Sequence, residues 1–232
     1  MSQSTREATL PSRCAEAEWL AAEIVQLREE WRLDRHPFLQ RWVAGELTAV
    51  DLQLFAAEHH HAAVALEDVG RRAAALSDGL LGEQLGGYAE AQEESVELSC
   101  EFASATGWGR SAWYFAQDPL AQTEQCARTW AGENESLAQH LVTIHAVQSS
   151  LAQLAPRQLG ALVEHYGFDM DSARYFVRLA ERAPGDAALG EAALTSLLPL
   201  VSPRTLVHQA EMAYRSYLEL LDGVQMLSER SS

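Results

Sequence analysis

The residues best suited to chemistry in this sequence are polar side chains that fall on apolar helix faces. A helix turns by about 100° per residue, so the face of each position follows from its number. Seven polar positions share or flank such a face: His59, Tyr88, Gln92, Ser95, Ser99, His145 and Gln148. A buried amide or hydroxyl without a partner costs about 1–3 kcal/mol, so these groups need each other, water or a ligand. The pattern leaves two interpretations: a hydrogen-bond network across three helices, or a polar-lined cavity in a helical bundle.

Histidine is the side chain best suited to act as a general base near neutral pH, and three histidines are consecutive here. In the run from Glu58 to His61, helix geometry points His59 inward, His60 to the flank and His61 outward. This run is therefore not a chelating cluster. Glu58 and His61 form an ExxH element, but di-iron bundles use two such elements, and we expect this one to face solvent.

The elements that must position these side chains are helices. Helical periodicity runs through almost the whole sequence, and no stretch alternates with the period of a strand. Capping residues and prolines predict helices at about residues 48–76, 78–106, 133–155, 171–183 and 203–230, with others before residue 35 and after Pro119. Pro184-Gly185 is expected to end one of them. The sequence predicts an all-α fold of seven or eight helices, with a flexible N-terminus at residues 1–13 and a single domain at residues 14–230.

The composition excludes several functions. The 232 residues carry 17 basic and 33 acidic side chains, and a net charge of −16 disfavours binding to a nucleic-acid backbone. No apolar run approaches the roughly 20 residues of a membrane helix, and the first residues lack the apolar core of a secretory signal. The three cysteines form no CxxC pair, which is typical of reduced thiols. We expect a cytoplasmic protein with no nucleic-acid or membrane partner.

Two blocks of the sequence resemble a known superfamily. The first is His36-Pro-Phe-Leu with Trp42 and the run Gly45-Glu-Leu-Thr48, and the second runs from Glu164-His-Tyr-Gly-Phe168 through Arg174-Tyr-Phe-Val-Arg178 to Asp186. The first resembles the opening of the TenA/PqqC superfamily. The second is similar to pyrroloquinoline-quinone synthases (PqqC) and to CADD-type di-iron proteins. The likeness spans about residues 15–227, and it implies a heme-oxygenase-like helical bundle and a homodimer.

The same resemblance bears on metal binding. The six ligand positions of the di-iron members correspond here to Tyr88, Ser95, Gln148, Leu179, Ala183 and Asp186. Only one of these is a carboxylate, whereas a non-heme iron site needs several His and carboxylate donors. The resemblance therefore implies no metal and no cofactor, as in PqqC, with iron held by a shifted ligand set as an alternative.

The leading hypothesis is a PqqC-like, metal-independent enzyme of small-molecule biosynthesis, acting oxidatively on an aromatic or heterocyclic substrate inside the bundle. His59 or His145 acts as general base, and Tyr88 and Tyr175 donate to a developing oxyanion or peroxide. Six further residues are expected to contact the substrate: Gln148, Gln92, Ser95, Ser99, Arg178 and Asp186. The resemblance places Tyr175 and Asp186 on a tyrosine and an aspartate of PqqC. Two alternatives remain: a non-catalytic protein that binds a small molecule or a partner, and a non-heme iron oxygenase.

Overall fold

A computed structural model describes residues 13–107, 118–132, 136–197 and 201–231. Within these ranges the chain forms eight α-helices and one 3-10 turn, and no strand. The helices are α1 (Arg13–Glu30), α2 (Pro37–Val43), α3 (Ala49–Ala75), α4 (Gly79–Ala105), α5 (Ala121–Trp130), α6 (Leu137–His165), α7 (Arg174–Leu197) and α8 (Pro203–Ser231), with the turn η1 (Leu33–Arg35) after α1. The all-α prediction is confirmed. Of the segment predicted to be flexible, residues 1–12 lie outside the described residues, and Arg13 already begins α1.

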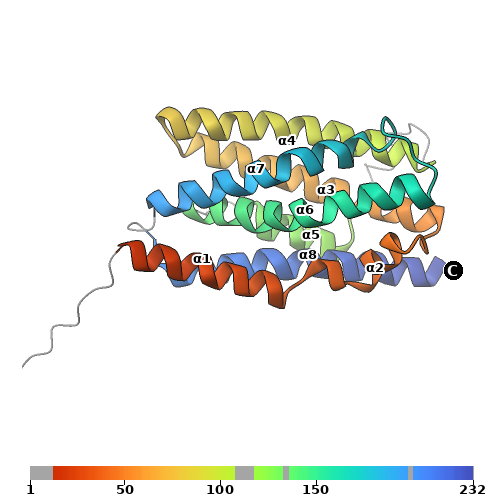
Figure 1. Cartoon of the computed structure of the whole chain (residues 1–232), viewed down its shortest axis with the longest axis horizontal. Coiled ribbons are helices and arrows are strands. Elements are labelled where there is room, and N and C mark those ends of the chain that lie inside the picture. Colours follow the sequence, from red (N-terminus) through yellow and green to blue (C-terminus); the bar gives the residue numbers. More distant parts are fainter. Residues whose placement is uncertain (1–12, 108–117, 133–135, 198–200, 232) are drawn as a thin grey trace, which may run out of the picture.

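The long helices run side by side along the long axis of the molecule (Figure 1). Helix α6 packs along α7, and α3 packs along α4. Helix α3 also contacts α5, α6 and α8, so it lies at the centre of the bundle, whereas α1 packs on α8 and α6. None of the described helices is both long enough and apolar enough to cross a membrane.

Local capping explains where α2 and α3 begin. The Thr48 hydroxyl accepts the backbone N–H of Asp51, and the Asp51 carboxylate accepts the N–H of Thr48 at 2.8 Å, which is a capping box. His36 caps α2, because its Nδ1 accepts the N–H of Phe38 at 3.2 Å. The other ring nitrogen of His36 lies 3.1 Å from a carboxylate oxygen of Asp222 on α8. The His-Pro-Phe motif is therefore a structural corner that ties α2 to the last helix.

Two helices continue past the points where the sequence predicted their ends. Helix α6 runs ten residues beyond Ala155 through Pro156, and α7 runs through Pro184 to Leu197. A proline inside a helix removes one hydrogen bond and costs about 3 kcal/mol. Both prolines are exposed, while the helix faces before and after them are buried between α6 and α7. Burial of these continuous apolar faces offsets the local cost, which is why the prediction of helix ends was wrong here.

The core on the α2 side is a cluster of aromatic rings. Trp42 is fully buried and contacts Phe38, Phe55, Phe102 and Phe176, with ring centroids 4.8 Å apart for Phe55 and 5.5 Å for Phe176. These residues come from α2, α3, α4 and α7. Aromatic rings bury large apolar surfaces and pack with preferred edge-to-face geometry. The cluster therefore fixes α3 and α7 at the point where the interior polar residues begin.

Candidate functional site

His59 is the central polar residue of the bundle interior. It is 5% exposed and stacks on Phe55, with ring centroids 4.8 Å apart. Its Nε2 lies 2.7 Å from the hydroxyl of Tyr175 on α7, and its Nδ1 lies 3.2 Å from the hydroxyl of Tyr217 on α8. The inward position predicted for His59 is confirmed. Three helices thus meet in one chain of hydrogen bonds, Tyr175-His59-Tyr217.

Burial keeps the three hydrogen-bonded side chains uncharged. It lowers the pKa of His59 from 6.5 to about 3, with a smaller contribution from His60, because a charged imidazole loses its solvation in the interior. Burial likewise raises the pKa of Tyr175 and of Tyr217 above the usual value for a phenol. A neutral imidazole has one N–H and one lone pair, so one tyrosine donates to the ring and the other accepts from it. This arrangement can pass a proton through the ring without creating a buried charge.

A second interior polar group joins α4, α6 and α7. The Gln148 amide donates to the hydroxyl of Tyr88 at 3.0 Å, and the Gln92 amide donates to the Asp186 carboxylate at 3.5 Å. Gln148 is fully buried, and its side-chain oxygen has no partner among the described residues. Burial raises the pKa of Asp186 to about 6, although the charge of Arg182 opposes this shift. Tyr88, Gln92 and Gln148 were predicted on inner helix faces, and Asp186 was named from the resemblance; the structure joins the four residues in two hydrogen-bonded pairs.

The two predicted serines each donate to a carbonyl of their own helix. Ser95 donates to the carbonyl of Ala91 at 3.0 Å, and Ser99 donates to the carbonyl of Val96 at 2.7 Å. The Ser99 oxygen also lies 2.8 Å from Nδ1 of His60. Serine hydroxyls often bond to a preceding carbonyl in this way. The inward polar residues had two interpretations, a hydrogen-bond network or a polar-lined cavity. These bonds and the two interior groups favour the hydrogen-bond network.

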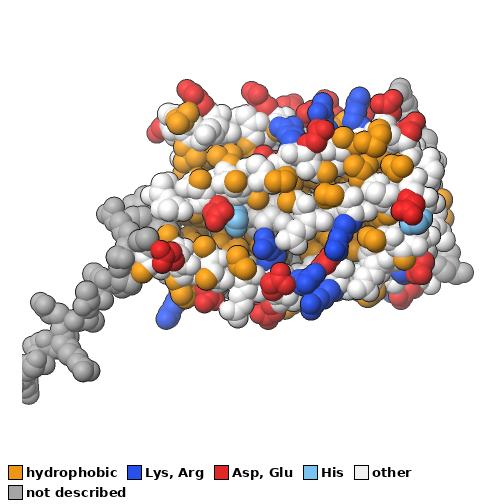
Figure 2. Space-filling view, in the orientation of Figure 1, with side chains coloured by type: hydrophobic (Ala, Val, Ile, Leu, Met, Phe, Trp, Pro, Cys, Tyr) orange, Lys and Arg blue, Asp and Glu red, His pale blue; other side chains and the backbone are white. Residues whose placement is uncertain are grey.

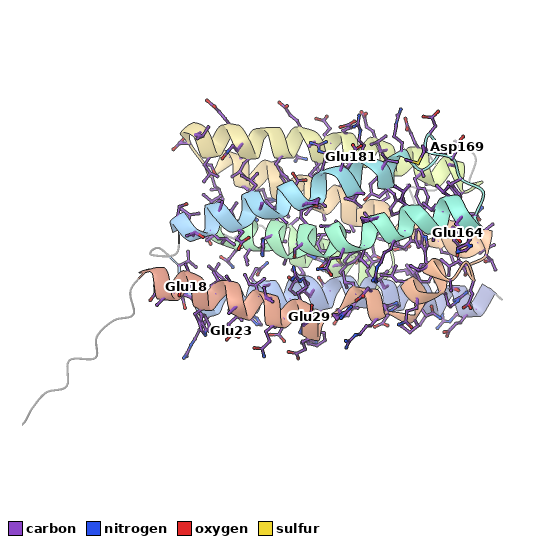
Figure 3. The ribbon with its side chains drawn as sticks, viewed as in Figure 1. Glu18, Glu23, Glu29, Glu164, Asp169 and Glu181 are labelled. Atoms are coloured by element: carbon purple, nitrogen blue, oxygen red, sulfur yellow. The ribbon has the colours of Figure 1, made fainter. Side chains whose placement is uncertain are left out.

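His145 and Arg178 lie apart from these groups. Nδ1 of His145 lies 2.9 Å from the carbonyl oxygen of Ala187, and its ring lines a shallow hollow between α1, α6 and α7. Arg178 is half-exposed and pairs at 3.0 Å with Glu181, which Figure 3 labels on α7. His59 and His145 are therefore not parts of one site.

Two other placements differ from expectation or were not anticipated. Glu58 was expected to face solvent, but it is buried. Its carboxylate accepts the backbone N–H of Leu120 at 3.1 Å, which satisfies it in this position. Tyr217 was not predicted as a site residue. It lies on the buried face of α8 with Leu220 and Val224, so an inward tyrosine in that apolar stripe was the signal that could have identified it.

The positions that the sequence resemblance assigned to iron ligands do not supply a ligand set. Leu179 and Ala183 are buried and apolar, and Gln148 bonds to Tyr88. Asp186 supplies the one carboxylate. Across the part of the chain that the structure describes, no three His, Cys, Asp or Glu side chains gather closely enough to hold a metal ion. The described residues therefore do not fit a non-heme iron centre.

Comparison with known proteins identifies the class of fold. The sequence matches no protein-family model and no curated protein. Among solved structures, a TenA homologue from P. horikoshii OT3 has a TM-score of 0.70 at 13% identity, covering 94% of this chain and 99% of its own. A TenA homologue from Pseudomonas syringae pv. tomato has a TM-score of 0.70 at 12% identity, covering 96% and 100%. Heme oxygenase-1 from Synechocystis sp. PCC6803, solved with heme, has a TM-score of 0.62 at 16% identity, covering 93% and 95%.

These similarities define an all-α protein with the heme-oxygenase-like fold that TenA homologues also have. At such low identity they establish the fold and leave the activity to be argued from the site. The expected likeness to the PqqC branch remains a prediction.

Proposed function

We propose that this protein carries out metal-independent oxidation of a small, uncharged aromatic or heterocyclic molecule, with the Tyr175-His59-Tyr217 chain moving a proton. The observation that carries the proposal is the pair of tyrosine hydroxyls at 2.7 Å and 3.2 Å from the two nitrogens of one buried histidine. A relay of neutral groups suits an apolar interior, because no step leaves an isolated charge there. The aromatic surroundings, which include Phe55, favour a flat and uncharged substrate.

The chemistry balances with O2 as the oxidant. The substrate loses two electrons and two protons, and O2 takes up both and becomes H2O2. One tyrosine accepts a substrate proton while passing its own proton to His59. The imidazole passes its N–H proton to the other tyrosine, which releases a proton to the reduced oxygen. The second substrate proton passes directly from the substrate to the reduced oxygen, which completes H2O2. His59 therefore acts as a relay, a role that a histidine with a pKa of about 3 can fill although it is a weak general base.

Oxygen consumption tests this function. A panel of phenols and aromatic amines is added to the protein, and O2 uptake is compared with H2O2 formation. We expect one member of the panel to give equimolar O2 uptake and H2O2. We expect Tyr217→Phe to lower kcat by about tenfold or more with KM nearly unchanged, because general acid–base groups contribute about 10²–10⁴-fold.

The matched control is Tyr166→Phe. The Tyr166 hydroxyl bonds to the carbonyl of Trp42 at 3.0 Å and accepts the N–H of Leu47 at 3.1 Å, at the end of α6. This variant loses the same hydroxyl outside the relay, and it should keep kcat. Absence of O2 uptake with every compound, or equal kcat in the wild type and Tyr217→Phe, would refute the proposed function.

A second candidate is a non-catalytic binding protein. The observation that favours it is that both nitrogens of His59 are already engaged and its pKa is far below neutrality. Native mass spectrometry of freshly purified protein distinguishes the two candidates. A binding protein should retain a small molecule that survives buffer exchange, and Tyr217→Phe should leave both its amount and its identity unchanged while no O2 is consumed.

A further inference from the structure

A surface hollow between η1, α2 and α6 carries features of a ligand site separate from the interior relay. It has a volume of about 390 Å³, which is within the range of about 300–1,000 Å³ typical of small-molecule sites. Its apolar lining includes Leu39, Val43 and Leu154, and Val43 is 45% exposed. The face formed by α1, α2 and α6 is turned to the viewer in Figure 2, and arginine side chains gather near its middle.

Gln158 presents an unused amide to this hollow. The residue is 3% exposed and lines the hollow, and its side chain makes no hydrogen bond with any described residue. An amide offers two N–H donors and one acceptor, and in Gln158 these groups face the hollow. Gln158 therefore gives the hollow an amide that no described residue uses and that a bound molecule can reach.

The hollow also carries a positive charge that no described carboxylate neutralises, although the whole chain has a net charge of −16. Its carboxylate, Asp34, is held by the guanidinium of Arg32 at 2.7 Å and 2.9 Å and by Arg157 at 3.1 Å. The Arg32 hydrogen bond keeps the pKa of Asp34 below its usual value, so this carboxylate stays charged. Arg35 lines the same hollow, is exposed, and has no ion pair with a described residue. Two arginines thus hold this carboxylate, and Arg35 is available to an anion.

We propose that this hollow binds a small organic monoanion with one carboxylate and a short apolar body. The Gln158 amide donates to the carboxylate, and the guanidinium of Arg35 supplies the opposite charge. Leu39, Val43 and Leu154 cover the apolar body. A single available cation beside Asp34 suits one negative charge better than a phosphate dianion, because the second charge would lack a partner.

Calorimetric titration with octanoate tests the proposal. We expect one octanoate per chain for the wild type and an affinity about fivefold lower for Arg35→Gln, since one partly exposed charge pair is lost. Arg204→Gln is the matched control, because Arg204 is an exposed arginine at the start of α8, away from the hollow, and this variant should bind as the wild type does.

Ala44→Phe leaves the charge unchanged but fills the hollow, so it should abolish binding. Gln158→Leu should weaken binding at least fivefold without lowering the free energy of unfolding, because it removes an unpaired amide.

Three results would overturn the proposal. The first is no detectable binding of octanoate to the wild type. The second is equal affinity in the wild type and Ala44→Phe, which would place the bound octanoate elsewhere. The third is a dimer that Ala44→Phe dissociates in analytical ultracentrifugation, since a second copy of the chain would then cover the hollow. None of these measurements involves O2 consumption, so this site and the interior relay are tested separately.

Discussion

Acidification should destabilise this protein through His59. The pKa of this histidine is about 3 in the folded chain, where it is buried, and 6.5 in an unfolded chain. Because the unfolded state binds the proton more readily, the stability contributed by neutral His59 is complete above pH 6.5. It is lost progressively as the pH falls from 6.5 towards 3. Each pH unit in that window lowers the free energy of unfolding by about 1.4 kcal/mol, so His59 should account for a loss of roughly 2 kcal/mol at pH 5.

Chemical unfolding at pH 7.5 and pH 5, followed by circular dichroism, measures this loss. His60 has a pKa lowered to about 4 and also destabilises the protein at low pH. Asp186 acts in the opposite direction, because burial raises its pKa to about 6 and its protonation favours the folded state. The test is therefore a difference: His59→Gln cannot titrate, and it should lose about 2 kcal/mol less than the wild type between the two pH values. Equal losses in the two proteins would refute the burial and the neutral state assigned to His59.

Other substitutions test the hydrogen bonds and the close helix packing. Tyr175→Phe leaves a buried nitrogen of His59 without its hydrogen-bond partner at 2.7 Å. It should lower the free energy of unfolding, measured by urea titration, by about 1–3 kcal/mol. A loss under about 0.5 kcal/mol would contradict this hydrogen bond. Gly70→Ala places a methyl group 2.8 Å from the ring of Tyr88, so it should cost about 1–3 kcal/mol and lower the Tm. Gly86→Ala meets no atom within 4 Å inside α4, so it should gain about 0.4–1 kcal/mol. A gain of stability in Gly70→Ala as well would show that α3 and α4 are not in close contact at Gly70.

Features that depend on neighbours in the sequence were predicted well. The capping box at Thr48 and Asp51 places the start of α3, and α4 begins and ends within a residue of the predicted limits. The inward position of His59 followed from the 3.6-residue period alone. The prediction was wrong for the ends of α6 and α7, because the sequence shows the cost of Pro156 and Pro184 but not the surface that the continued helices bury.

The candidate site was predicted in its residue types but not in its pairings. Face angles place Tyr88, Gln92 and Gln148 inside the bundle, and the structure confirms that all three are buried. The angles do not say which groups meet, and Gln148 bonds to Tyr88 while Gln92 bonds to Asp186. The face of a helical residue is a property of one helix, whereas a hydrogen bond between helices also requires their axial offset and crossing angle.

The sequence by itself determined that this chain forms a helical bundle with polar residues on inward faces, because helix periodicity and capping act over a few residues. Only the tertiary structure decided that His59 lies between two tyrosines, 116 and 158 residues further along the chain. It also decided that His145 lies in a separate hollow and that Gln158 faces another. The physical reason is that packing between distant helices sets which side chains share a site, and this packing depends on the summed burial of whole helix faces rather than on any single residue.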